Sequence, residues 1–172
     1  MAPLKVVIHS TAHDCDSLEK TECLLDHLKS CCIEPHTSVL GCIDPKVILE
    51  ALQTSKNTLA LISPSIRFLV DPTHFSELDC DIAVFTNKQV PIGKKDHIDS
   101  NFILFQSKPK TIDFLHEWIE KLERKKDQDP LVVLNQIVKT KALSMQILHL
   151  SPHLKISNVA EQPAFHRWLM EV

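Results

Sequence analysis

The chain has 172 residues, of which 44% are hydrophobic and 24% are charged, the balance of a folded globular domain rather than of a disordered segment. Its 19 basic and 22 acidic side chains give a formal net charge of −3, which argues against nucleic acid or an anionic membrane as a partner. No apolar run approaches the roughly 18 residues of a membrane span, and the first ten residues lack the pattern of a secretion signal. We therefore expect a single cytoplasmic domain over residues 1–172.

The first half of the sequence predicts alternating strands and helices. Three apolar runs rich in β-branched residues predict buried strands, at 5–9, 37–43 and 58–63. Between the first two runs, apolar residues at helical spacing follow Ser17, and Pro35 is expected to end that helix. A second helix is predicted to begin at Pro45, because proline is well suited to the first helical position.

The second half mixes strands with paired helices. Shorter apolar runs predict strands at 81–85, 102–105 and 145–150. The segment 66–78 predicts a short helical turn broken by Pro72, and Thr111 is expected to cap a long amphipathic helix. A further helix follows Pro130. This order of elements indicates an α/β fold with a mainly parallel sheet.

The scarcity of glycine and the spacing of cysteine exclude several kinds of site. The chain has two glycines, Gly41 and Gly93, and these isolated residues cannot form a phosphate-binding P-loop or a Rossmann fingerprint. The six cysteines contain no C-x-x-C pair and the ten histidines no H-E-x-x-H motif. We interpret the cysteines as free thiols and predict no zinc site.

The segment 45–158 carries a series of motifs in a characteristic order. PKVILEAL precedes TLALISPSIRFLVDPTHF and DCDIAVF, and these are followed by DSNFILFQSKPKTIDFLHEWIEKL, by Asp127-Gln128 and by ILHLSP. In their order and spacing, these motifs resemble the nucleotide-diphospho-sugar transferases that share the GT-A glycosyltransferase fold. The resemblance implies a three-layer α/β domain whose mainly parallel sheet contains one or more antiparallel strands.

The sequence departs from this family at its metal site. The Asp-x-Asp motif of the family holds a divalent metal on the diphosphate of the sugar donor, and the matching positions here are Ser63 and Ser65. Two neutral hydroxyls are poor ligands for Mn²⁺ or Mg²⁺, so no metal is expected there. A divalent cation such as Mn²⁺ is expected only if the site has moved, for which Asp79 and Asp81 are the candidates.

The resemblance also implies which other residues belong to the site. The Asn-Ser-Gly motif of the family, next to the donor sugar, matches residues 99–101. The candidate substrate-binding residues are Ser63, Ser65, Arg67, Asp99, Ser100 and Asn101. Asp127 and Gln128 match a pair near the acceptor or catalytic centre and are the candidate catalytic residues. An alternative interpretation of Asp127 is that it caps the following helix.

The sequence is consistent with three functions. The first is a glycosyltransferase-like domain without metal-dependent activity, which acts as a binding or interaction domain with a nucleotide sugar or a protein as its partner. The second is an active glycosyltransferase that needs no metal, in which Arg67 and Lys46 supply positive charge to the diphosphate. Titration of nucleotide sugars with and without Mn²⁺ distinguishes the two.

The third function belongs to a different class. VVIHSTAHDCDSLEKTECLLDHLKSC and TLALISPS resemble the first strand and helix, and a later strand, of Toll/interleukin-receptor signalling domains, in which Glu77 would be the candidate NAD-cleaving acid. That resemblance requires five parallel strands in sequential order. The transferase resemblance instead requires an antiparallel strand over 102–106 beside the strand at 59–62.

Overall fold

The computed structural model describes residues 4–9, 17–31, 33, 35–40, 43–69, 71–87, 97–125, 127–141, 144–150 and 155–156. In chain order the elements are β1 (Lys5–His9), α1 (Ser17–Ser30), β2 (Pro35–Leu40), α2 (Pro45–Ser55), β3 (Leu59–Ile62), β4 (Arg67–Phe68), the 3₁₀ helix η1 (Pro72–Glu77), β5 (Ile82–Asn87), β6 (His97–Phe105), α3 (Pro109–Arg124), α4 (Pro130–Lys141), β7 (Ile147–Leu150) and β8 (Lys155–Ile156). Within these ranges, no helix has the length and apolar character needed to cross a membrane.

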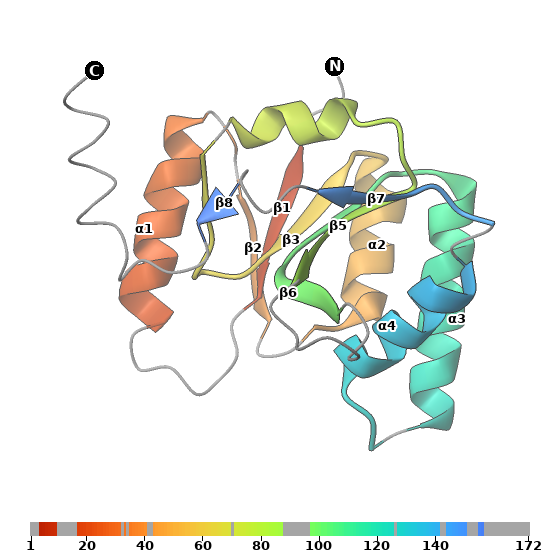
Figure 1. The fold of residues 1–172 in the computed structure, drawn as a ribbon. Helices are drawn as coiled ribbons and strands as arrows, with labels where there is room; N and C mark the ends of the chain where they lie inside the picture. The colour runs from red at the N-terminus through yellow and green to blue at the C-terminus, as the bar shows by residue number, and fades with distance from the viewer. Residues whose placement is uncertain are drawn as a thin grey trace.

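A six-stranded sheet with the order β2-β1-β3-β6-β5-β7 forms the centre of the molecule (Figure 1). β1 pairs in parallel with β2 and β3, and β5 pairs in parallel with β7. β6 differs, because it runs antiparallel to β3 on one side and to β5 on the other. The antiparallel strand that the transferase resemblance requires is therefore present. The sequential parallel sheet of a Toll/interleukin-receptor domain is not the one that the described strands form.

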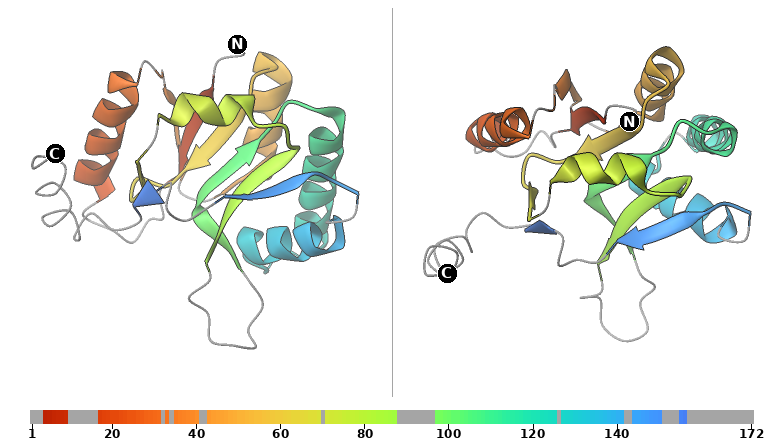
Figure 2. Two further views of the ribbon diagram at one scale, coloured as in Figure 1. Left: turned by 45° about the horizontal axis from the view of Figure 1, so that its top comes forward. Right: turned by 90° about the horizontal axis from the view of Figure 1, so that it is seen from above.

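Helices cover both faces of this sheet, which gives the expected three-layer α/β arrangement (Figure 2). α2, α3 and α4 lie on one face, and α1 lies on the other. The apolar run of β3 serves both sides, because successive side chains of a strand point to opposite faces. Leu59 and Leu61 pack toward α2 and α3, whereas Ala60 and Ile62 belong to the core on the side of α1. A continuous apolar run is what a strand covered on both faces requires.

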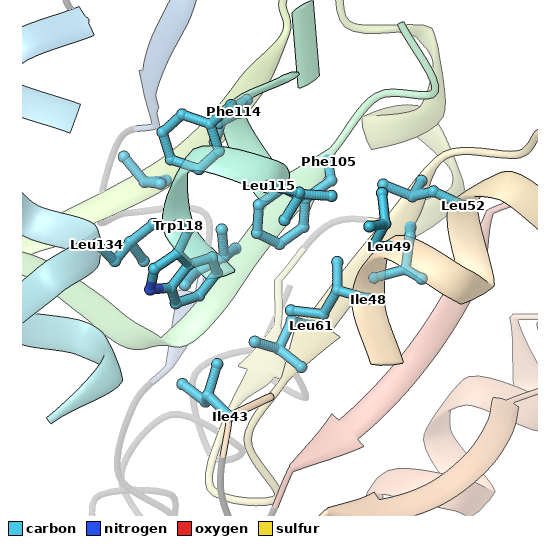
Figure 3. Packing of buried hydrophobic residues seen from close by; sticks show 14 of the residues in the cluster. Ile43, Ile48, Leu49, Leu52, Leu61, Phe105, Phe114, Leu115, Trp118 and Leu134 are labelled. Carbon is cyan, nitrogen blue, oxygen red and sulfur yellow. The ribbon is translucent and has the colours of Figure 1, made fainter. Parts of the chain in front are cut away.

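α3 provides the largest side chain of the core between the sheet and α2, α3 and α4. Phe114, Leu115 and Trp118 of α3 belong to the same buried cluster as Ile48, Leu49 and Leu52 of α2 (Figure 3). Trp118 is fully buried, and its indole N–H donates a hydrogen bond to the carbonyl oxygen of Pro130 at 3.0 Å. This bond joins α3 to the start of α4 and so fixes the ends of the turn between the two helices.

Two interpretations of helix starts are wrong. α3 begins at Pro109, so Thr111 lies inside its first turn, where its buried hydroxyl donates to the carbonyl oxygen of Asp81 at 3.2 Å. α4 is capped by Asp129, whose carboxylate accepts from the backbone N–H of Leu131 at 2.7 Å, and not by Asp127. Each helix starts at a proline, which has no N–H to leave unpaired at the first helical position.

The strand bounds differ from prediction where polar residues take part in pairing. β6 begins at His97 rather than at residue 102, because its first half continues alongside the end of β5 through the pairs Thr86 with Ile98 and Asn87 with His97. β4 and β8 form a separate two-stranded sheet that was not predicted. Elements of two residues have too little pattern to be recognised from sequence.

Candidate functional site

The candidate substrate-binding residues gather where β3 ends beside the middle of β6. We call this side of the sheet, where the parallel strands β1, β3 and β5 end, the carboxyl edge. The pair Ile62 and Phe102 is the last of the β3–β6 ladder, and the backbone N–H of Ser63 then donates to the carbonyl oxygen of Asn101 at 2.9 Å. Because β6 runs in the opposite direction, its first half extends past the end of β3. Ligands of open α/β sheets bind at edges of this kind.

Ser63 and Ser65 are held together by a tight turn. The backbone N–H of Ile66 donates to the carbonyl oxygen of Ser63 at 3.1 Å, which closes a four-residue turn with Pro64 as its second residue. The two serine hydroxyls share a hydrogen bond of 2.9 Å, and the Ser65 hydroxyl donates to Oδ1 of Asn101 at 3.2 Å. Both serines and Asn101 are half-buried. We call Ser63, Ser65 and Asn101 the hydroxyl–amide cluster.

The hydroxyl protons of this cluster are donated in one order, from Ser63 to Ser65 and from Ser65 to Asn101. Since the single hydroxyl proton of Ser65 is donated to Asn101, the bond between the serines places Ser63 as the donor. Both hydroxyl protons therefore point inside the cluster. The cluster has no charge and offers oxygen lone pairs without a carboxylate.

These residues do not fit a divalent cation. Mn²⁺ and Mg²⁺ prefer carboxylate oxygens, and here two neutral hydroxyls and one carboxamide stand in their place. Within the described ranges, no group of three or more His, Cys, Asp or Glu side chains is arranged to hold a metal ion.

The backbone alone locates three further candidates. Arg67 belongs to β4, where it pairs with Ile156 of β8, and it follows Ser65 by two residues. Asp99 and Ser100 lie in the first half of β6, directly before Asn101. The chain thus brings these three residues to the same edge as the hydroxyl–amide cluster.

Asp127 and Gln128 lie in the turn between α3 and α4. Both side chains are exposed, and the backbone N–H of Gln128 donates to the carbonyl oxygen of Lys125 at 3.0 Å. Figure 1 shows this turn beyond the carboxyl edge, at the far end of the α3–α4 pair. No hydrogen bond or ion pair among the described residues joins Asp127 or Gln128 to Ser63 or Ser65.

A shallow groove of about 340 Å³ lies between the start of α2 and the second half of α3. It is lined by Asp44, Pro45, Lys46, Ile119, Leu122 and Glu123. The ammonium of Lys46 forms an ion pair of 2.8 Å with Glu123, and the hydrogen bond to Glu123 raises the pKa of Lys46. None of the candidate substrate-binding residues lines this groove. Lys46 is thus engaged on the helical face rather than beside the serines.

The literal Asp-x-Asp of the chain, Asp79 to Asp81, lies at the opposite side of the sheet. We call that side, where β3 and β5 begin, the amino edge. Asp81 is buried, and its carboxylate accepts from the backbone N–H of Gln146 at 2.9 Å. Asp79 is exposed and pairs with Lys108 at 3.1 Å. Burial raises the pKa of the Cys80 thiol between them to about 11. The structure gives these two carboxylates separate partners, and it does not bring them to the hydroxyl–amide cluster.

Sequence reasoning missed a second polar cluster at the amino edge. The hydroxyl of Thr58 donates to Oε1 of Gln106 at 2.6 Å, and the amide group of Gln106 donates to the carbonyl oxygen of Leu78 at 3.0 Å. Both side chains are buried. We call Thr58, Gln106 and the Leu78 carbonyl the glutamine cluster. The available signal was a single polar residue beside each of two apolar strands, Thr58 before β3 and Gln106 after β6.

Comparison with known proteins rests on the fold. No protein-family model and no curated protein sequence matches the chain. A solved glycosyltransferase involved in glycosylation of the major capsid of PBCV-1 superposes with a TM-score of 0.57 over 86% of this chain and 83% of that one, at 8% identity. The apo form of the glycosyltransferase GlyE of Streptococcus pneumoniae TIGR4 gives a TM-score of 0.55 at 11% identity, with 100% of this chain covering 51% of that one.

A nucleotidyltransferase fold is similar as well. A Bacillus anthracis protein described as a glucose-1-phosphate thymidylyltransferase superposes with a TM-score of 0.52 at 9% identity, over 98% of this chain and 96% of that one. The match to GlyE spans about half the length of that protein. The chain has the α/β fold of GT-A-type nucleotide-sugar transferases, as its motifs predicted, and identities this low speak for the fold alone.

Proposed function

We propose that this chain is a GT-A-like domain that binds a nucleotide or nucleotide sugar without a metal ion and does not carry out metal-dependent glycosyl transfer. The hydroxyl–amide cluster supports this proposal. At the end of β3, where the resemblance expects two metal-binding carboxylates, Ser63 and Ser65 are neutral and bonded to each other and to Asn101.

The chemistry of transfer explains why this matters. When a sugar leaves its nucleotide, negative charge builds up on the diphosphate, and a bound cation is the usual means of neutralising it. The described part of the cluster offers no charge for that purpose. Weak binding of a nucleotide needs less, because hydrogen bonds and contact with the base and ribose add to affinity without stabilising the departing diphosphate.

The remaining candidates enter this proposal with separate roles. Arg67, Asp99 and Ser100 complete the proposed ligand surface beside the hydroxyl–amide cluster. Asp127 and Gln128 are proposed for the acceptor side and contribute nothing to binding of a free nucleotide. Metal-independent transfer finds no support at Lys46, because Glu123 already pairs with that ammonium at 2.8 Å.

Calorimetric titration tests the proposal directly. UDP, GDP and their glucose conjugates are titrated into the protein with Mn²⁺ and again with a chelator. We expect a dissociation constant that is unchanged by the metal, and no metal-dependent release of nucleoside diphosphate from the sugar nucleotide. Clear Mn²⁺-dependent hydrolysis or transfer would contradict the loss of activity. Absence of binding under both conditions would contradict the nucleotide ligand and leave a protein partner.

A gain-of-function variant sharpens the result. The double substitution Ser63→Asp, Ser65→Asp supplies two carboxylates at the end of β3, and we expect it to make nucleotide binding dependent on Mn²⁺. The matched control is Ser107→Asp, Ser144→Asp, which adds the same charge at two exposed serines away from the carboxyl edge. The control protein is expected to keep the metal-independent behaviour of the original chain.

A further inference from the structure

β7 is the outermost strand of the six-stranded sheet (Figure 2). It pairs with β5 on its inner side, and no described strand pairs with its outer side. Unpaired strand edges attract other strands, so most proteins protect them with charged residues or proline. The strand at the opposite border of the sheet, β2, begins with Pro35. The sequence of residues 144–150, SMQILHL, contains no charged residue and no proline.

The pairing with β5 shows which backbone groups of β7 point outward. The carbonyl oxygen of Gln146 accepts from the backbone N–H of Asp81 at 2.8 Å, so the backbone of Gln146 faces β5. In a strand the backbone groups alternate from side to side. Leu148 and Leu150 therefore also face β5, whereas the N–H and C=O groups of Ile147 and His149 face outward.

The side chains of β7 leave an apolar residue at the middle of this edge. Leu148 is 37% exposed, and His149 and Gln146 are exposed beside it. Two lysines whose partners are described have those partners within the chain. Lys141 pairs with Glu117 at 2.9 Å, and Lys110 donates to the carbonyl oxygen of Ser144 at 3.2 Å. A second copy of residues 144–150 would bring no charged side chain against the first.

We propose that two copies of this chain associate through antiparallel pairing of their β7 strands across a twofold axis. The axis passes beside Leu148, so that Leu148 of each copy lies opposite Leu148 of the other. Ile147 then faces His149 of the second copy, and His149 faces its Ile147. These are the residues whose backbone groups point outward, so each of the two pairs exchanges two hydrogen bonds.

The register is consistent with the side chains. Residues opposite each other without a mutual hydrogen bond approach most closely, with Cα atoms about 4.5 Å apart. In this register the closest pair is Leu148 with Leu148, the most apolar exposed position of the strand. Gln146 lies opposite Leu150, which adds no charge. A twofold interface requires this self-complementarity, because the same surface serves both partners.

The mass of the protein in solution tests the pairing. Analytical ultracentrifugation over a range of protein concentrations is expected to show a dimer that dissociates on dilution. Leu148→Lys places two positive charges opposite each other and is expected to give the monomer mass at every concentration. Leu148→Glu is expected to do the same. An equimolar mixture of the two variants is expected to recover the dimer mass, because lysine then faces glutamate.

Two controls separate loss of pairing from loss of folding. Val132→Lys changes a residue of α4 that is 49% exposed, and it is expected to leave the dimer unchanged. Circular dichroism of each variant is expected to match that of the original protein. A wild-type protein that stays monomeric at all concentrations overturns the proposal. So does a dimer that survives both Leu148→Lys and Leu148→Glu.

Discussion

The two edges of the sheet hold polar residues in contrasting ways. At the amino edge, the side chains of Thr58 and Gln106 are buried, and the hydrogen bonds of the glutamine cluster join residues far apart in the sequence. At the carboxyl edge, the hydroxyl–amide cluster is half-buried; its Ser63 and Ser65 lie within one turn, and Asn101 of β6 is bonded to Ser65. Buried polar groups must be matched within the protein, whereas half-buried ones can exchange their partners for water or a ligand. The first edge therefore contributes to stability, and the second is the edge at which we propose that a ligand binds.

The largest effect is expected from breaking the glutamine cluster. Gln106→Leu leaves the buried Thr58 hydroxyl without its acceptor, whereas the half-buried Leu78 carbonyl keeps its hydrogen bond from the Cys80 N–H. We expect the free energy of unfolding to fall by about 2 kcal/mol, because one buried unsatisfied group costs roughly 1–3 kcal/mol. Urea-induced unfolding measures this loss. The control Gln53→Leu changes an exposed glutamine of α2 and is expected to have almost no effect; equal losses in both variants would show that the amino edge is not special.

A smaller loss of stability is expected from changing Asp81, whose carboxylate is hydrogen-bonded to the residue before β7. Its buried carboxylate accepts from the Gln146 N–H at 2.9 Å. Asp81→Ala is expected to lower the free energy of unfolding by about 1.5 kcal/mol, the low end for a hydrogen bond to a charged group, because water can reach the exposed Gln146. Hydrogen exchange at the Gln146 amide is expected to accelerate. Asp81→Asn keeps an acceptor oxygen and should lose less stability; an equal loss would mean that shape rather than this bond matters.

A change at the carboxyl edge is expected to be milder still. Ser65→Ala removes the bonds to Ser63 and Asn101, but all three residues are half-buried and can be hydrated. We expect a loss of about 1 kcal/mol in the free energy of unfolding. Comparison with Gln106→Leu by the same urea titration tests the contrast between the edges. If Ser65→Ala proved the more destabilising of the two, the carboxyl edge would be a structural element rather than a binding surface.

The smallest loss of stability is expected for the ion pairs of Glu117, which lie on α3 and α4 away from both edges of the sheet. Glu117 pairs with Lys121 at 2.8 Å and with Lys141 at 2.9 Å. The hydrogen bond from Lys121 lowers the pKa of Glu117 below its usual value of 4.5, with a further contribution from Lys141. A carboxylate with a lowered pKa stabilises the folded state above its unfolded pKa, and this contribution is lost as the pH falls through the folded pKa.

The substitution Glu117→Gln isolates this contribution. At pH 7 we expect it to lower the free energy of unfolding by about 0.5 kcal/mol, the size of a surface ion pair. Well below the pKa of Glu117, the variant and the original protein should unfold at the same urea concentration. A difference that persists unchanged in acid would attribute the effect to packing instead of charge.

The sequence predicts the parts of the fold that depend on local pattern. The apolar runs of β1 and β3 and the amphipathic stripe of α3 appear where they were expected, because burial of one face dictates their spacing. The extension of β6 to His97 was not predicted, since its first residues are polar and are ordered by pairing with β5. Local pattern carries no information about such pairing.

The candidate site shows the same division. The motif order led to Ser63, Ser65 and Asn101, and the pairing of β3 with β6 brings these three into direct contact. Asp127 and Gln128 were assigned by the same motifs, but their side chains are exposed in the turn between α3 and α4, and no described hydrogen bond joins them to Ser63 or Ser65. The glutamine cluster was not predicted, because Thr58 and Gln106 are 48 positions apart and neither was singled out as a site residue.

The reversed direction of β6 has a mechanical consequence. This single strand holds Asn101 at one end of the sheet and leads directly into Gln106 at the other. Ladders with β3 and β5 hold its second half on both sides, and a slip of one residue there would turn every side chain to the wrong face. The register of this one strand therefore sets the positions of both the glutamine cluster and the proposed binding surface.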